Sequence, residues 1–153
     1  MPNTYFKFKQ FTVHQANAAL KVSTDSCLFG AWISELIRSK SYEVRNIFDV
    51  GAGSGLLMLM LAQKCNAMIV GIEIDEPSYL QANENIELSL WKERLHLLHG
   101  DVKEFVFNKK YDLIISNPPY VGAQAMAALP AEYLREPQLA LASGEDGLTH
   151  TRG

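Results

Sequence analysis

No apolar run in this sequence approaches the roughly 20 residues that a membrane-spanning helix requires. Residues 1–11 alternate lysine with aromatic side chains and contain no apolar core of a signal peptide. Cysteine is scarce as well, and the two that are present, Cys27 and Cys65, lack the spacing of a disulfide framework. We therefore expect reduced thiols and a cytoplasmic location for this 153-residue chain, whose length suits one domain.

Histidine is also sparse and does not gather with the cysteines. His96 and His99 stand three positions apart in an expected strand, so their side chains would point to opposite faces. The sequence therefore predicts no metal site.

The net charge of −3 argues against a wholly basic nucleic-acid binder. Its distribution is uneven, because residues 1–45 carry six basic and three acidic side chains, whereas the remainder carries eight and fourteen. A basic edge on an acidic body suits contact with a phosphate backbone. A plain solvated surface is the alternative, which charge alone favours.

Apolar periodicity predicts the first long helix. Leu28, Trp32 and Leu36 recur every four positions, which indicates a helix over residues 23–38, capped by Ser23 or Thr24.

Four short apolar runs then predict β-strands, at residues 47–50, 67–75, 94–101 and 111–117. Helices are expected between the first three strands, at residues 54–64 and 76–90. The first of these helices is apolar almost all round and should be buried, whereas in the second Tyr79, Ala82, Ile86 and Leu90 would share a face behind Pro77. Strands that alternate with helices predict an α/β fold with a parallel sheet and right-handed crossovers.

Three glycines follow the first expected strand in the stretch DVGAGSG, at Gly51, Gly53 and Gly55. Glycine lets the backbone turn sharply and approach a ligand closely, and the helix after the loop offers unpaired N–H groups to an anionic group. A tight structural turn is the alternative, since G-x-G-x-G differs from the dinucleotide fingerprint G-x-G-x-x-G.

Acidic residues end the neighbouring strands. Glu73 lies at the end of the second strand, at the spacing where a carboxylate binds ribose hydroxyls, and Asp101 follows the third strand. Because the carboxyl ends of parallel strands meet at one edge of a sheet, the sequence predicts a nucleoside-bearing cofactor there. A solvated acid at a strand end is the alternative for Glu73.

The fourth strand leads into Asn-Pro-Pro-Tyr, at residues 117–120. The side-chain oxygen of Asn117 and the backbone carbonyl of Pro118 would accept hydrogen bonds from the N–H groups of an amine or amide, which favours attack by its nitrogen. Pro119 has no N–H that would compete, and Tyr120 would stack on a flat base or amide. A rigid exit turn with a core tyrosine is the alternative.

The combined stretches DVGAGSG, IEID, GD and NPPY resemble the class I S-adenosylmethionine-dependent methyltransferases with an Asn-Pro-Pro-Tyr motif. That resemblance implies a Rossmann-like fold, S-adenosylmethionine as cofactor, and methylation of adenine N6 or a glutamine amide. It implies a loop of three glycines around the methionine part, Glu73 on the ribose, Asp101 on the adenine amine, and Asn117 to Tyr120 on the target nitrogen. The cofactor-binding residues are then expected to be Thr24, Asp49, Gly51, Gly53, Gly55, Glu73, Asp101 and Asn117. For Thr24, which would touch the amino-acid end of the cofactor, a simple helix cap is the alternative.

Residues 5–120 resemble the bacterial family that methylates adenine N6 beside the anticodon of valine tRNA, through FKQF, KVSTD, GAW, LMLAQ, NENI and DLIISNPPY. The tail differs, because residues 117–150 resemble glutamine-N5 methyltransferases, with E-P-x-x-A-L-x-x-G-x-D-G-L matched from Glu136 to Leu148. The substrate is therefore expected to be tRNA, with a ribosomal protein or release factor as the alternative.

The resemblance also implies a seven-stranded sheet ordered 3-2-1-4-5-7-6, of which only the first four strands are legible in this sequence. We expect an N-terminal extension and helix that pack on the cofactor site (residues 1–45), a cofactor-binding core (46–120) and a truncated substrate-side loop (121–153). The strand Leu113–Ser116 would then form an exposed apolar edge that invites self-association. A non-catalytic fragment that binds the cofactor is a further alternative.

Overall fold

The computed structural model describes residues 3–41 and 43–118. The chain divides into two compact units, Met1–Ser116 and Asn117–Gly153, and the fold below is that of the first.

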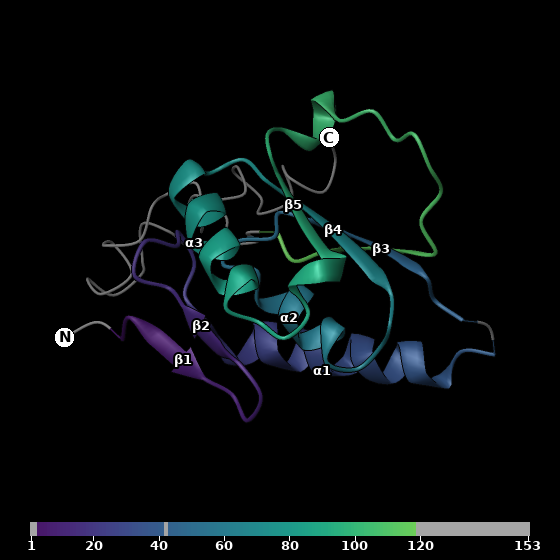
Figure 1. Ribbon diagram of the computed structural model, residues 1–153, viewed down its shortest axis with the longest axis horizontal. Coiled ribbons are helices and arrows are strands. Elements are labelled where there is room, and N and C mark those ends of the chain that lie inside the picture. The colour runs from purple at the N-terminus through teal and green to yellow at the C-terminus, as the bar shows by residue number, and fades with distance from the viewer. Residues whose placement is uncertain (1–2, 42, 119–153) are drawn as a thin grey trace, which may run out of the picture. The chain divides into compact units, whose positions relative to one another are not determined.

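Four parallel strands form the central sheet, as the sequence predicts (Figure 1). They are β3 (Asn46–Val50), β4 (Met68–Glu73), β5 (Leu95–His99) and β6 (Leu113–Ser116), in the order β5-β4-β3-β6. The pairs β3–β4, β4–β5 and β3–β6 are all parallel, so the carboxyl ends of the strands lie at one edge. The strand β3 lies between β4 and β6 inside the sheet, and the glycine loop follows directly after its last residue, Val50.

Two apolar clusters hold this sheet from opposite faces. The larger joins Ile47 of β3 and Ile69 of β4 to the helices on that side, and the smaller gathers aromatic rings around Phe48. Phe48 lies 5.0 Å from the rings of Phe105 and Tyr111, which belong to the connection between β5 and β6. Figure 1 shows this connection on the side of the sheet away from α1 and α2. It contains the short 3₁₀ helix η2 (Val102–Glu104), and another, η1 (Lys92–Arg94), precedes β5.

Helix α2 (Leu56–Ala62) is buried over its whole length, which confirms the prediction from its all-round apolar sequence. Helix α1 (Thr24–Ser39) packs against it and is also confirmed, with Ser23 as the cap that accepts a hydrogen bond from the backbone of Ser26.

The apolar series used to predict α1 does not form its packed face. Leu28 and Trp32 are 64% and 62% exposed, whereas Gly30 and Ile33 are buried. The reason is close packing, since a Cβ on Gly30 would lie 2.6 Å from the sulfur of Met60 in α2. The face that meets α2 therefore needs a residue without a side chain at position 30, which a search for large apolar residues misses.

Helix α3 (Glu76–Glu87) begins at Asp75, which caps it, and has Pro77 in its first turn as expected. Ala82 and Ile86 are buried, but Leu90 is 83% exposed because the helix ends before it. The placement of Leu90 on the packed face is therefore wrong.

An N-terminal hairpin was not predicted. The strands β1 (Tyr5–Lys7) and β2 (Thr12–His14) pair antiparallel in a separate two-stranded sheet. The edge of β2 that faces α3 contacts the side chain of Asn85. The N–H of His14 donates to Oδ1 of Asn85, and Nδ2 of Asn85 donates to the carbonyl of His14, both at 2.8 Å. The hairpin depends on this long-range contact, so its short strands leave little local signal.

No helix in the described part of the chain is long and apolar enough to cross a membrane.

Candidate functional site

The loop after β3 presents an open surface formed by two glycines. Gly51 and Gly53 have φ angles of 74° and 57°, the left-handed region that favours glycine, and a Cβ at either position would meet no atom of the described residues within 4 Å. Gly55 differs, because a Cβ there would touch that of Ala82 at 3.4 Å. The first two glycines thus leave room for a ligand, and the third serves the packing of α2 on α3.

The glycine loop is fixed to the end of β4 by hydrogen bonds. The N–H groups of Gly51 and Ala52 donate to the carbonyl of Ile72 at 2.9 and 3.0 Å. The N–H of Gly53 donates to Oε2 of Glu73 at 2.7 Å. The open surface is therefore held rigidly before any ligand arrives.

Glu73 is buried at the carboxyl end of β4 and holds two segments together. Its Oε2 accepts the hydrogen bond from Gly53, and its Oε1 accepts one from the N–H of Asp75 at 2.9 Å. Since a carboxylate has about four acceptor positions, the hydrogen bonds from the described residues leave each oxygen one position for a hydroxyl group. The predicted role of Glu73 toward ribose remains a prediction, and its bracing of the loop is an additional function that the sequence did not reveal.

Asp49 is fully buried two residues before Gly51, and neither of its carboxylate oxygens has a hydrogen-bond partner in the described part of the chain. It pairs with Gly71 of β4 and Ile115 of β6, at the centre of the sheet. Burial, and after it the negative charge of Glu73, raises the pKa of the Asp49 carboxyl from 3.8 to about 7. A buried acceptor without a donor is costly, so this carboxylate suits a ligand that brings a positive charge.

The end of β5 lies against the end of β4. The N–H of Gly100 donates to the carbonyl of Glu73 at 3.0 Å, and Asp101 follows directly. Asp101 is half-buried, and its Oδ1 accepts from the N–H of Lys103 at 2.9 Å. The structure thus brings the two predicted acids, Glu73 and Asp101, to the same edge of the sheet.

Ile74 is a candidate site residue that sequence reasoning missed. It follows Glu73 directly, is 55% exposed, and its carbonyl lies 3.2 Å from Nε2 of His99. An exposed apolar side chain beside two acids suits contact with a flat ring whose polar edge faces the acids. The signal was present in the stretch IEID, where an apolar residue continues past the end of the strand.

The remaining predicted residues are less well placed. Thr24 is exposed as the first residue of α1, and the capping role belongs to Ser23, so contact of Thr24 with a cofactor stays a prediction. Asn117 and Pro118 belong to the second unit, and Pro119 and Tyr120 lie outside the described residues. The chain reaches Asn117 directly from Ser116, whose hydroxyl donates to the carbonyl of Val50 at 3.0 Å. The catalytic roles of residues 117–120 therefore stay predictions.

The residues at this edge fit a nucleoside cofactor with a charged amino-acid tail. Among the residues that the structure describes, none would meet a Cβ at Gly51 or Gly53, two hydrogen bonds leave acceptor positions on Glu73, and no donor reaches Asp49.

A family model described as methyltransferase small domain matches residues 32–145. The chain is 44% identical over 120 residues to a tRNA1(Val) (adenine(37)-N6)-methyltransferase of Phocaeicola vulgatus, and 44% identical over 128 residues to the protein of that name from Dyadobacter fermentans. These alignments cover 78% and 83% of this chain but 49% and 51% of those proteins. The chain thus spans about half the length of the curated relatives it matches.

Two solved structures share the fold. The hMettl16 catalytic domain in complex with MAT2A 3′UTR hairpin 6 has a TM-score of 0.63 and 19% identity, over 87% of this chain and 51% of that one. A SAM-dependent methyltransferase from Agrobacterium tumefaciens has a TM-score of 0.61 and 14% identity, over 77% and 40%. At these identities the likeness concerns the fold alone, and it confirms the predicted Rossmann-like parallel sheet.

Proposed function

Because the chain belongs to the methyltransferase small domain family, we propose that this protein methylates N6 of an adenosine in the anticodon loop of valine tRNA, with S-adenosylmethionine as methyl donor. The observation that carries the proposal is the 44% identity to several proteins named for that reaction, over most of this chain. Such a reaction would take place in the cytoplasm.

The residues at the strand ends would each bind a different part of the cofactor. Gly51 and Gly53 would receive its amino-acid part, with the Asp49 carboxylate toward the amine. Glu73 would accept hydrogen bonds from the ribose hydroxyls, and Asp101 one from the adenine amine. Ile74 would contact the adenine ring, since its side chain is exposed beside Glu73. When bound, the cofactor supplies an electrophilic methyl group on a sulfonium.

Asn117 and Pro118 would prepare the nucleophile. Their oxygens would accept hydrogen bonds from both N–H groups of the adenine N6 amine. These hydrogen bonds would localise the nitrogen lone pair on N6, from where it can attack the methyl group. The bound cofactor would supply the methyl group to this nitrogen, while Asn117 and Pro118 would hold the amine hydrogens until the methylated nitrogen gives up one proton to water. Tyr120 would hold the base by stacking, so that catalysis rests on positioning and not on a covalent intermediate.

Asn117→Ala tests this mechanism. Loss of a hydrogen-bond acceptor that acts in the transition state should lower the rate of methyl transfer to unmodified valine tRNA by about 100-fold or more. The affinity of the variant for S-adenosylhomocysteine, measured as the rise in unfolding temperature that the ligand produces, should fall far less than the rate, because Asn117 is one of several residues expected to bind the cofactor.

The matched control is Asn108→Ala, since Asn108 is exposed in the connection before β6. It should transfer methyl groups at the wild-type rate. An unchanged rate in Asn117→Ala would remove that residue from the mechanism.

A glutamine amide is the second candidate acceptor, favoured by the sequence pattern from Glu136 to Leu148, which lies outside the described residues. The same assay with a large-subunit ribosomal protein or a release factor as acceptor separates the two. Methylation of the protein and not of tRNA would replace the leading proposal. Cofactor binding without transfer to either acceptor would favour a non-catalytic binding role.

A further inference from the structure

The outward face of the N-terminal hairpin combines aromatic rings with a lysine. Two cross-strand pairs form it, Tyr5 opposite His14 and Lys7 opposite Thr12. Val13 is fully buried, so the alternation along β2 directs Thr12 and His14 to the other side. Tyr5 is 51% exposed, and its ring centroid lies 6.4 Å from that of His14. We call Tyr5, Lys7, Thr12 and His14 the hairpin face.

The hairpin and the segment that follows it carry positive charge only. Residues 3–22 contain Lys7, Lys9 and Lys21 and no acidic residue, although the whole chain has a net charge of −3. Lys21 is engaged by backbone carbonyls, among them those of Ala16 and Ala18 at 3.2 and 3.3 Å. Lys7 and Lys9 are exposed and form no ion pair within residues 3–118. Their charges are therefore available to a polyanion.

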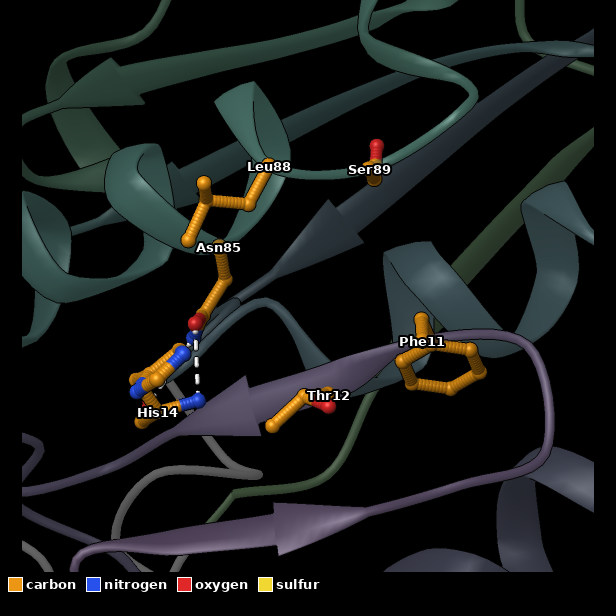
Figure 2. A pocket seen from close by; sticks show the side chains of 6 residues that line it. All are labelled: Phe11, Thr12, His14, Asn85, Leu88 and Ser89. Atoms are coloured by element: carbon orange, nitrogen blue, oxygen red, sulfur yellow. Dashed lines mark hydrogen bonds between the residues drawn. The ribbon is translucent and has the colours of Figure 1, made fainter.

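A pocket of about 310 Å³ adjoins the hairpin face (Figure 2). Figure 2 shows Thr12 and His14 on β2 opposite Asn85 and Leu88, where α3 ends. Its lining residues are Phe11, Thr12, His14, Asn85, Leu88 and Ser89. The volume is near the lower limit of small-ligand pockets, roughly 300–1,000 Å³, which suits one planar group and not a large ligand.

The hairpin face is tied to the glycine loop by one side chain. Asn85 is buried and donates from Nδ2 to the carbonyl of His14 at 2.8 Å and to that of Ser54 at 2.9 Å. The segment after β2 is held to the same helix, because the N–H of Ala19 donates to Oγ of Ser78 at 2.9 Å. A ligand on the hairpin face would thus bind a surface with a fixed position relative to the glycine loop.

We propose that the hairpin face and its adjoining pocket bind an unpaired nucleotide of the RNA substrate, distinct from the base that is methylated. The base stacks on Tyr5 and enters the pocket beside Thr12 and His14, while Lys7 and Lys9 contact the flanking phosphates. Aromatic side chains interleaved with lysine are the composition by which proteins bind single-stranded nucleic acid. An acidic protein partner would use the lysines but not the exposed ring. This inference rests on the proposed function, since it assumes an RNA substrate.

The test measures affinity for unmodified valine tRNA by fluorescence anisotropy in the whole protein. Tyr5→Ala should weaken binding about 5- to 100-fold, the effect of one lost base–aromatic stack, and Tyr5→Phe should restore it. Since Tyr5 is exposed, Tyr5→Ala should keep the wild-type unfolding temperature.

The double variant Lys7→Gln, Lys9→Gln should make the slope of log K against log salt shallower by about 1.5. Each phosphate contact contributes roughly 0.7–0.9 to this slope, and the variant loses two contacts. The control is Lys64→Gln, Lys110→Gln, which removes the same charge from exposed positions outside the hairpin. It should leave the salt slope at the wild-type value.

The outcomes separate this inference from the proposed function. If wild-type protein methylates tRNA but the hairpin variants match the control, the hairpin face is not an RNA surface and the proposed function stands. If Tyr5→Ala binds tRNA normally while the lysine variant loses affinity, the surface attracts any polyanion and the stacking proposal is wrong. If wild-type protein neither binds nor methylates tRNA, both are overturned.

Discussion

Asp49 shows how a single residue at the sheet centre links stability to ligand binding. Its strand position places it on the same face as Ile47, in the larger apolar cluster, yet its carboxylate has no hydrogen-bond donor within residues 3–118. Proteins rarely leave a buried polar group unpaired, and such groups cluster at functional sites. A cationic group from a ligand would remove the cost of this burial.

We expect Asp49→Asn to stabilise the protein at pH 8 and to have much less effect near pH 4. The pKa of Asp49 rises from 3.8 to about 7 on folding, so the folded state binds a proton more tightly than the unfolded state. Stability from this group is therefore full below about pH 4 and is lost as the pH rises to about 7, and asparagine avoids that loss. The free energy of unfolding, from denaturant titrations at several pH values, should diverge from wild type by an amount on the order of several kcal/mol.

Asp112 supplies a control of opposite sign. It is exposed, and hydrogen bonds from the N–H groups of Asn46 and Arg45 to its Oδ2, both at 2.8 Å, lower its pKa. Its stabilising contribution is thus present above its ordinary pKa and is lost as the pH falls through the lowered one. Asp112→Asn should destabilise the protein at neutral pH and not at the acid end. A flat profile for Asp49→Asn would show that its carboxyl is not held neutral by burial.

At the scale of elements, α3 holds the N-terminal segment through hydrogen bonds from its polar side chains. Ser78, Gln81 and Asn85 are buried at helical spacing, and they bond the backbone of residues 14, 17 and 19. A buried polar row on a helix is uncommon unless each group has a partner, and here the partners are the edge of β2 that faces away from β1 and the segment after β2. The helix thus replaces a missing neighbour strand for β2.

Asn85→Ala should free the hairpin from the glycine loop. The substitution leaves the N–H and C=O of His14 and the C=O of Ser54 without partners, at a cost of about 2–4 kcal/mol of stability. Amide hydrogen exchange at His14 should accelerate markedly. The control is Asn83→Ala on the same helix, which removes one bond to the carbonyl of Tyr79 and should change stability by under about 1 kcal/mol. Equal rates of amide hydrogen exchange at His14 in the two variants would show that Asn85 does not hold the hairpin.

For the whole molecule, the strand order leaves β6 at one side of the four-stranded sheet. Ile114 in β6 is 56% exposed, and no further strand pairs with β6 within the described residues. An exposed apolar edge strand is a template for pairing with another chain. Self-association through this edge, expected from the sequence, remains a prediction.

We expect this 153-residue chain to form dimers or larger species as its concentration rises, and Ile114→Lys to reduce that tendency, because a charged edge residue opposes strand pairing. Light scattering across a concentration series measures both. Leu28→Lys is the control, since Leu28 is 64% exposed on α1 and lies outside the sheet. A single monomeric species at every concentration would dismiss association through β6.

Local chemistry was enough to determine much of this protein from its sequence. Strand and helix periods, the cap at Ser23, the proline in α3 and the glycine turn after β3 each depend on neighbouring residues, and all are found in the structure. Parallel pairing then follows, because crossover helices leave few other arrangements. The motifs also indicated the family, since a glycine-rich loop, an acidic residue at the end of the next strand and an Asn-Pro-Pro-Tyr segment occur together in few folds.

Only the tertiary structure decided which side chains are covered. Leu28 and Trp32 are exposed because α1 meets α2 through another face, where Gly30 lies against Met60. The edge of the hairpin is held by Asn85, 71 positions beyond His14. The burial of Asp49 and the double use of Glu73 likewise depend on residues distant in the chain. Periodicity records the conformation of a segment, but it does not record its neighbours, and the neighbours determine burial, partners and pKa.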